Sequence, residues 1–79
     1  MILSKGDIIK NTKRNDHPDF ANTIANAELI YEVIRVNRKT YGLKCIEGYM
    51  KGSCCNLCKD FKESGVDVYG TTSTWELIG

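Results

Sequence analysis

Two runs of β-forming residues, separated by a short polar turn, constrain the fold of this chain more than any other feature. Glu28–Val36, ELIYEVIRV, is rich in β-branched and aromatic residues, and Tyr41–Ile46, YGLKCI, resumes that character after the turn Asn37–Thr40. The apolar side chains of the second run alternate with glycine and lysine, so they share one face of a strand. These apolar residues are Tyr41, Leu43 and Cys45. The pattern predicts an antiparallel β-hairpin.

Weaker signals precede this hairpin. Lys5–Lys10, KGDIIK, has the composition of a turn that enters a short strand. The stretch Asn11–Ala27 is polar and contains the only proline, Pro18. It predicts a long ordered loop with one helical turn after Asp19, and loops of that length in small domains are usually functional or mobile.

After the hairpin the periodicity changes. In Cys55–Glu63 the apolar residues Leu57 and Phe61 are spaced i and i+4, and Gly65 follows as a stop signal. This predicts two helical turns. Residues 66–78 then predict two short strands, the second with Trp75 in the core.

The predicted elements amount to a single small domain over residues 1–79. A chain of this length buries only about 60–65% of its unfolded surface, so every apolar strand position matters. Four or five antiparallel strands with one short helix leave unpaired edges unless the sheet curls on itself. We therefore predict a mainly β protein, α+β at most, folded as a small, partly open barrel.

Short strand motifs follow one another in this order: KGDII, a long polar loop, YEVIRVNRKTYGLK and the terminal STWELI. This order resembles that of SH3-like small β-barrels of phages and mobile elements. The resemblance covers the strands alone, because Tyr49–Gly65 has no counterpart in the pattern. It implies a binding module without catalytic residues. The high content of Ile, Lys and Asn is typical of AT-rich genomes and favours a phage or mobile-element protein that binds a host component.

Three of the four cysteines lie close together in the stretch GSCCNLCKDF. Cys55 and Cys58 have the C-x-x-C spacing at which a tight turn places two sulfurs on one zinc ion. A zinc site would add Cys45 and His17, with Cys54 as the substitute for Cys55. The interpretation we favour is that the thiols are reduced and pack in a compact turn, since a second C-x-x-C is absent and free cysteines are commonly buried. A thioredoxin-like redox role would need a βαβ unit that this chain does not offer.

Two surfaces are candidates for binding. For a protein partner we expect exposed aromatic side chains, Phe20 in the long loop and Tyr49 after the hairpin, to form the contact. The alternative is a nucleic-acid partner held by the hairpin, where cations could contact phosphates and an aromatic ring could stack on a base. The hairpin residues concerned are Arg35, Arg38, Lys39 and Tyr41.

Bulk properties exclude several classes of function. The net charge is +1, so no overall field directs the chain to nucleic acid or a membrane, although Val33–Lys51 holds five basic side chains and one acidic one. With one histidine and no phosphate-binding loop, we expect no enzymatic activity. The N-terminus MILSKGDII carries charges too early for a signal peptide, and no apolar run spans a membrane, which predicts a cytoplasmic protein. A homodimer is compatible with this sequence.

Overall fold

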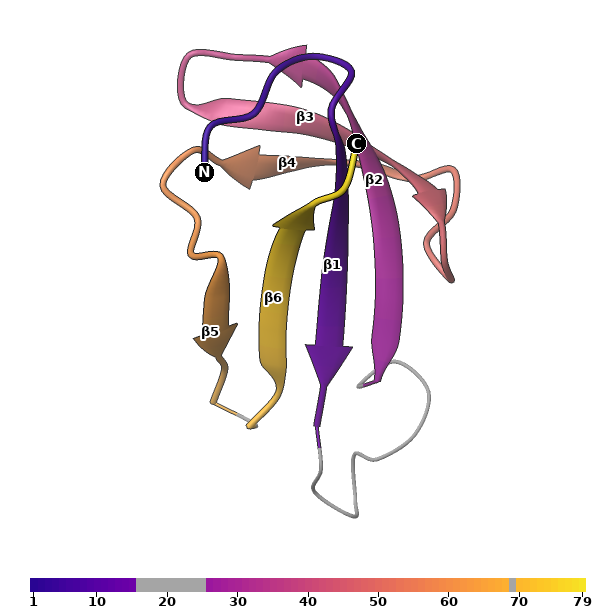
Figure 1. The fold of residues 1–79 in the computed structure, drawn as a ribbon, viewed down its shortest axis with the longest axis vertical. Coiled ribbons are helices and arrows are strands. Elements are labelled where there is room, and N and C mark those ends of the chain that lie inside the picture. Colours follow the sequence, from indigo (N-terminus) through magenta and orange to yellow (C-terminus); the bar gives the residue numbers. More distant parts are fainter. Residues whose placement is uncertain (16–25, 69) are drawn as a thin grey trace.

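The computed structural model describes residues 1–15, 26–68 and 70–79, and these residues form one antiparallel sheet without a helix (Figure 1). Within them the sheet has six strands in the order β4-β3-β2-β1-β6-β5 and curls into a half-barrel. The mainly β prediction is confirmed, whereas the predicted strand number and the short helix are wrong. The strands are β1 Ile8–Arg14, β2 Ala27–Val36, β3 Thr40–Glu47, β4 Cys54–Cys58, β5 Ser64–Val66 and β6 Thr72–Leu77.

The predicted hairpin is confirmed as β2 and β3, and it produces the curl. Their register shifts twice, between Ile30 and Tyr31 and between Val33 and Arg35. Such bulges bend a strand and increase its twist. In Figure 1, β2 accordingly starts alongside β1 and ends where β3 crosses the top of the molecule. One long strand therefore belongs to both halves of the curled sheet.

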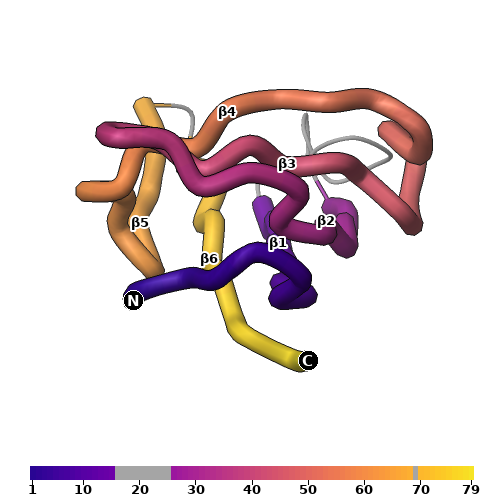
Figure 2. Tube along the Cα trace, turned by 90° about the horizontal axis from the view of Figure 1, so that it is seen from above, coloured from indigo at the N-terminus to yellow at the C-terminus, as the bar shows by residue number. Residues whose placement is uncertain are grey.

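The inner face of the sheet carries the core. Its alternating side chains are buried, and each aliphatic side chain fully removed from water contributes about 1.5–3 kcal/mol. Tyr41, Leu43 and Cys45 lie together on this face, as predicted. The N-terminal segment passes on the side of the core opposite β4 (Figure 2); Leu3 donates its N–H to the Tyr41 hydroxyl at 3.2 Å. The buried core residues are Leu3, Ile9, Leu29, Tyr31, Val33, Tyr41, Leu43 and Cys45, with Met1, Leu57, Phe61 and Trp75 packed against them.

The helix predicted over Cys55–Glu63 is replaced by a strand and a turn. Cys54–Cys58 is β4, paired with β3 over its whole length, and Phe61 N–H then donates to the Cys58 carbonyl in a turn. The i, i+4 spacing of Leu57 and Phe61 still brings both side chains to the core, but from a strand and a turn. Cys and Asn are weak helix formers, so the hydrogen bonds available along β3 override the local pattern.

The long loop predicted over Asn11–Ala27 is shorter than expected. β1 continues to Arg14, and β2 begins at Ala27. Asn11 is buried because its side chain finds partners on β6, which polarity alone does not reveal. The predicted helical turn after Asp19 lies outside the described residues. At the C-terminus the expected strand around Val66 is the short β5, and β6 contains Trp75 as predicted.

Candidate functional site

β4 forms one end of the sheet, and its outer edge is open within the described residues. Its single strand neighbour is β3. Two bonds mark the start and end of their ladder: Cys45 N–H donates to Ser53 O at 2.8 Å, and Lys59 N–H donates to Lys39 O at 2.9 Å. Hydrogen-bonded and non-hydrogen-bonded pairs alternate in an antiparallel ladder. Between these two bonds, Cys55 and Leu57 are therefore the β4 residues whose backbone groups bond to β3.

The remaining β4 residues therefore direct their backbone groups away from the sheet. The N–H and C=O of Cys54 and Asn56 point outward, as does the N–H of Cys58, whose carbonyl accepts the Phe61 N–H. Unpaired groups of this kind are a template for another strand. β4 also has no charge and no proline, two devices that natural edges use to prevent such pairing.

Exposed apolar side chains adjoin this edge. The turn between β3 and β4 carries Tyr49, which is 52% exposed, and Met50, which is 42% exposed. The exposure predicted for Tyr49 is confirmed. Met50 was not singled out from the sequence, because a single methionine in a glycine-bounded turn gives no signal of its own. Phe20, the other aromatic residue proposed for protein contact, lies outside the described residues.

An open hollow of about 260 Å³ lies beside the edge, on the outer face of the sheet. Gly42 on β3 pairs with Arg35 on one side and with Asn56 on the other. Glycine adds no side chain here, and the Arg35 stem approaches it closely, because a Cβ at position 42 would lie 3.0 Å from the Arg35 Cβ. The hollow is lined by Ile34, Arg35, Gly42, Leu43, Cys54, Cys55 and Asn56. Sequence reasoning missed it, although a glycine inside a strand is a signal for a bulge or a close approach.

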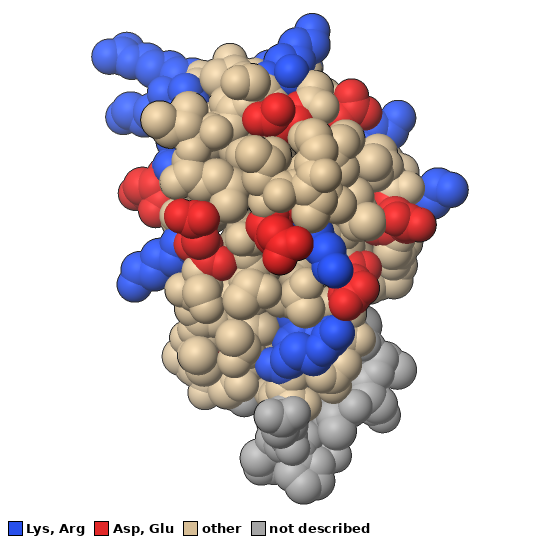
Figure 3. Space-filling view, viewed as in Figure 1, with Lys and Arg blue, Asp and Glu red and all other residues tan. Residues whose placement is uncertain are grey.

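Cations surround the β4 end of the sheet, and in the described structure they form no ion pairs. Arg35, Arg38 and Lys39 are all exposed, as the hairpin prediction requires. Figure 3 shows Lys and Arg side chains gathered at the upper left, over the end where Figure 1 places the β2–β3 turn. The exposed cations around β4 are Arg35, Arg38, Lys39, Lys44, Lys51 and Lys59.

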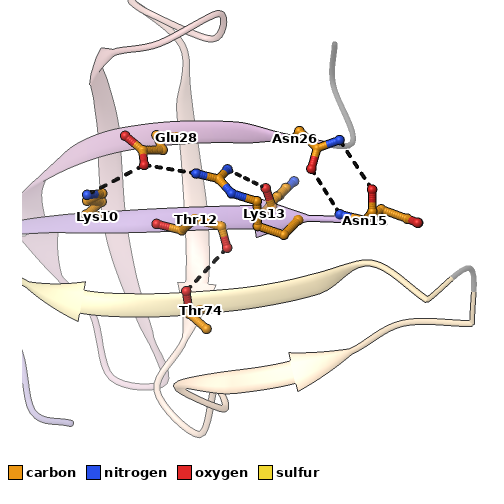
Figure 4. Close-up of polar contacts among 8 residues, drawn as sticks. Lys10, Thr12, Lys13, Asn15, Asn26, Glu28 and Thr74 are labelled. Atoms are coloured by element: carbon orange, nitrogen blue, oxygen red, sulfur yellow. Dashed lines mark hydrogen bonds and ion pairs between the residues drawn. The ribbon is translucent and has the colours of Figure 1, made fainter. Parts of the chain in front are cut away.

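The cations of β1 are arranged differently. Glu28 on β2 accepts Arg14 Nη2 at 3.1 Å and lies 3.8 Å from Lys10 Nζ (Figure 4). The positive charge on this side of the sheet is thus partly compensated within the protein. At the β4 end, by contrast, the exposed Arg35, Arg38 and Lys39 have no ion-pair partner among the described residues.

Tyr41, which was expected to stack on a base, is buried in the core. It is 3% exposed, and its hydroxyl accepts the Leu3 N–H. Lys59 Nζ lies 5.4 Å from the centre of its ring. Tyr41 faces the core because it alternates in phase with Leu43, so the hairpin offers a ligand its cations without this aromatic platform.

The predicted zinc ligands are distributed over both faces of the sheet. Cys55 pairs with Leu43 on the inner face, and Cys58, three residues further along the same strand, lies on the outer face. Cys45 is buried, and its thiol donates to the Glu47 carbonyl at 3.2 Å. His17 lies outside the described residues, and no group of three metal-ligating side chains is found among the others. A C-x-x-C pair chelates a metal from a turn, whereas a strand separates its two sulfurs.

The inner-face thiols share a partly dry environment with Tyr31. Burial, followed by the neighbouring Cys45 and Cys54, raises the pKa of the Cys55 thiol. Burial, followed by Cys55, Cys45 and Tyr49, raises the pKa of Tyr31 to about 12. Both shifts favour the neutral form of the side chain.

Comparisons with known proteins do not assign the chain to a group: no family model, no curated protein and no solved structure matched it. The described residues also contain no helix that is long and apolar enough to cross a membrane.

Proposed function

We propose that this protein is a small non-catalytic binding module that acts on a protein partner, and that the partner adds a strand to β4. In this mode main-chain hydrogen bonds supply affinity, and alternate side chains supply specificity. The SH3-like relationship, the phage or mobile-element origin and the cytoplasmic location remain predictions from the sequence.

The observation that supports the proposal is the unprotected edge of β4. The outward groups of Cys54, Asn56 and Cys58 offer a partner a row of donors and acceptors. Tyr49 and Met50 add an exposed apolar contact at one end of that row. Aromatic side chains and methionine are enriched in protein interfaces.

The test uses a variant that changes the edge and leaves the fold intact. Because the Asn56 N–H points away from β3, Asn56→Pro removes an edge donor without removing a β3–β4 hydrogen bond. The matched control is Asn56→Ala, which keeps the N–H. Random seven-residue peptides displayed on phage would be selected on the wild-type protein, with melting curves to show that both variants fold.

We expect peptides that bind the wild-type protein and Asn56→Ala with similar affinity. Their affinity for Asn56→Pro should be lower by about tenfold or more, because the proline removes a strand hydrogen bond and its ring also blocks the approaching strand. Equal binding to all three proteins would exclude strand addition at β4.

A second candidate function is nucleic-acid binding by the hairpin cations, which is favoured by the exposed Arg35, Arg38 and Lys39, since none of them has an ion-pair partner in the described structure. It predicts salt-dependent retention on mixed-sequence DNA, because bound phosphates release counterions. The double substitution Arg38→Ala and Lys39→Ala should abolish that retention while the melting temperature stays unchanged. Retention that is insensitive to both changes would remove this candidate.

A zinc-stabilised module is the third alternative, and it would require Cys58 or Cys55 to leave the strand geometry described above. Native mass spectrometry of protein purified without chelator tests it. A mass excess of one zinc ion that is lost on denaturation would support it.

A further inference from the structure

We infer that the strand received by β4 is an extended acidic segment, in which carboxylate side chains alternate with apolar ones. This inference rests on the proposed function and specifies the chemistry of its partner. It follows from the side chains on the outer and inner faces of β4, because a strand paired with β4 would place its own side chains beside them on the same two faces.

The outer face determines the acidic positions. A partner residue opposite Asn56 directs its side chain to the same face as Asn56, toward the hollow at Gly42. Arg35 lines the far side of this hollow and forms no ion pair in the described structure. At a strand spacing of about 4.8 Å, Arg35 lies three strands, or roughly 14 Å, from that partner residue.

That separation suits a long acidic side chain. An extended arginine and a glutamate can together span roughly 14 Å, over Gly42, which adds no side chain, and past Asn56, whose short side chain shares this outer face. The next outward position of the partner lies beside Cys54, whose own neighbour on β3 is Lys44. Glu32 is opposite Lys44 in the register, but no ion pair joins them, so Lys44 is available as well.

The inner face determines the apolar positions. Cys55 and Leu57 point to the core side of β4 and are incompletely covered. Partner residues between the acidic ones would lie against these two side chains and continue the apolar surface of the sheet. The resulting consensus alternates glutamate with valine, isoleucine or leucine.

Charge also argues against a second copy of this chain as the occupant. Antiparallel pairing of β4 with itself would place the cations around one edge, including Lys44 and Lys59, near those of the other copy. Like charges brought together at an interface oppose association. The carboxylates of an acidic strand would instead be attracted to these cations.

The experiment analyses the composition of the selected peptides and then tests one pair of charges. We expect enrichment of glutamate or aspartate at every second position with apolar residues between. For a selected peptide, Arg35→Gln should weaken binding about threefold to tenfold in fluorescence anisotropy. Arg14→Gln is the matched control, because it removes the same charge from β1, away from the edge.

A peptide with glutamine at the acidic position completes a double-mutant cycle, in which Arg35→Gln should have no further effect. Peptides that bind through Asn56 but lack acidic residues, or that ignore Arg35→Gln, would overturn the inference and leave strand addition intact. Failure to select any peptide that distinguishes Asn56→Pro would overturn both. A dimer in light scattering that Asn56→Pro converts to monomer would assign the edge to a second copy and also overturn the inference.

Discussion

Asn11 on β1 donates from its side-chain amide to the Ser73 hydroxyl of β6 at 2.9 Å, inside the core. The same nitrogen lies 3.1 Å from the Thr74 carbonyl, and the residue is only 2% exposed. This buried amide donates both of its protons to β6, so side-chain hydrogen bonds join the two strands in addition to the backbone hydrogen bonds of the ladder. The contact therefore holds β6 against β1 within the sheet.

Asn11→Ala should therefore lower the free energy of unfolding by about 2 kcal/mol, because it removes two side-chain hydrogen bonds from a buried amide. Urea unfolding followed by Trp75 fluorescence measures this change. Ser73→Ala, which removes one acceptor alone, should cost about 1 kcal/mol. If Asn11→Ala were as stable as the wild type, the amide would not join β1 to β6.

Position 48 requires glycine because the backbone there has a positive φ and lies close to β2. Its φ is +113°, and a Cβ there would lie 2.6 Å from Leu29 Cδ2 and 2.8 Å from the Glu28 carbonyl oxygen. Gly48→Ala should lower the free energy of unfolding by roughly 3 kcal/mol, from the unfavourable φ and the clash together. Chemical denaturation would measure the difference.

Gly52 provides the matched control. Its φ is +93°, but a Cβ there would meet nothing within 4 Å. Gly52→Ala should cost only the conformational part, about 1–2 kcal/mol. Equal losses at the two glycines would show that contact with Leu29 contributes nothing.

The hairpin could be predicted because its signals are local: β-branched residues, alternation and a polar turn between them. The edge at β4 could not, because CCNLC has no strong strand preference and becomes a strand only through pairing with β3. Burial of Asn11 depends on Ser73 far along the chain, and the hollow at Gly42 depends on the pairing of β3 with both β2 and β4. The exposed cations could be predicted from their turn, and the shared face of Tyr41, Leu43 and Cys45 from their alternation, which at the same time argues against Tyr41 as a base-stacking ring.

The raised pKa of Tyr31, about 12, makes stability depend on pH in the alkaline range. Between about pH 10 and 12 the unfolded chain loses the phenolic proton while the native protein keeps it. Deprotonation therefore favours the unfolded state, and the free energy of unfolding falls as the pH rises, by at most about 1.4 kcal/mol per pH unit from this group.

Urea unfolding at about pH 9 and pH 11 for the wild type and Tyr31→Phe isolates this contribution. The stability of the wild type relative to Tyr31→Phe should be smaller at the higher pH, because phenylalanine has no proton to lose. An unchanged difference between the two proteins would mean that Tyr31 titrates alike in the native and unfolded states.

The four thiols should separate into two kinetic classes. Cys54, Cys55 and Cys58 are exposed, whereas Cys45 is buried and bonded to the Glu47 carbonyl. An excess of an aromatic disulfide reagent should modify the first three rapidly and Cys45 only as the protein opens. Because the pKa of the Cys55 thiol is raised, it holds less thiolate near neutral pH than an ordinary thiol, so its labelling should be slower than that of a small free thiol and should accelerate as the pH rises. Mass mapping of the labelled sites distinguishes the residues, and rapid labelling of Cys45 in the native protein would contradict its place in the core.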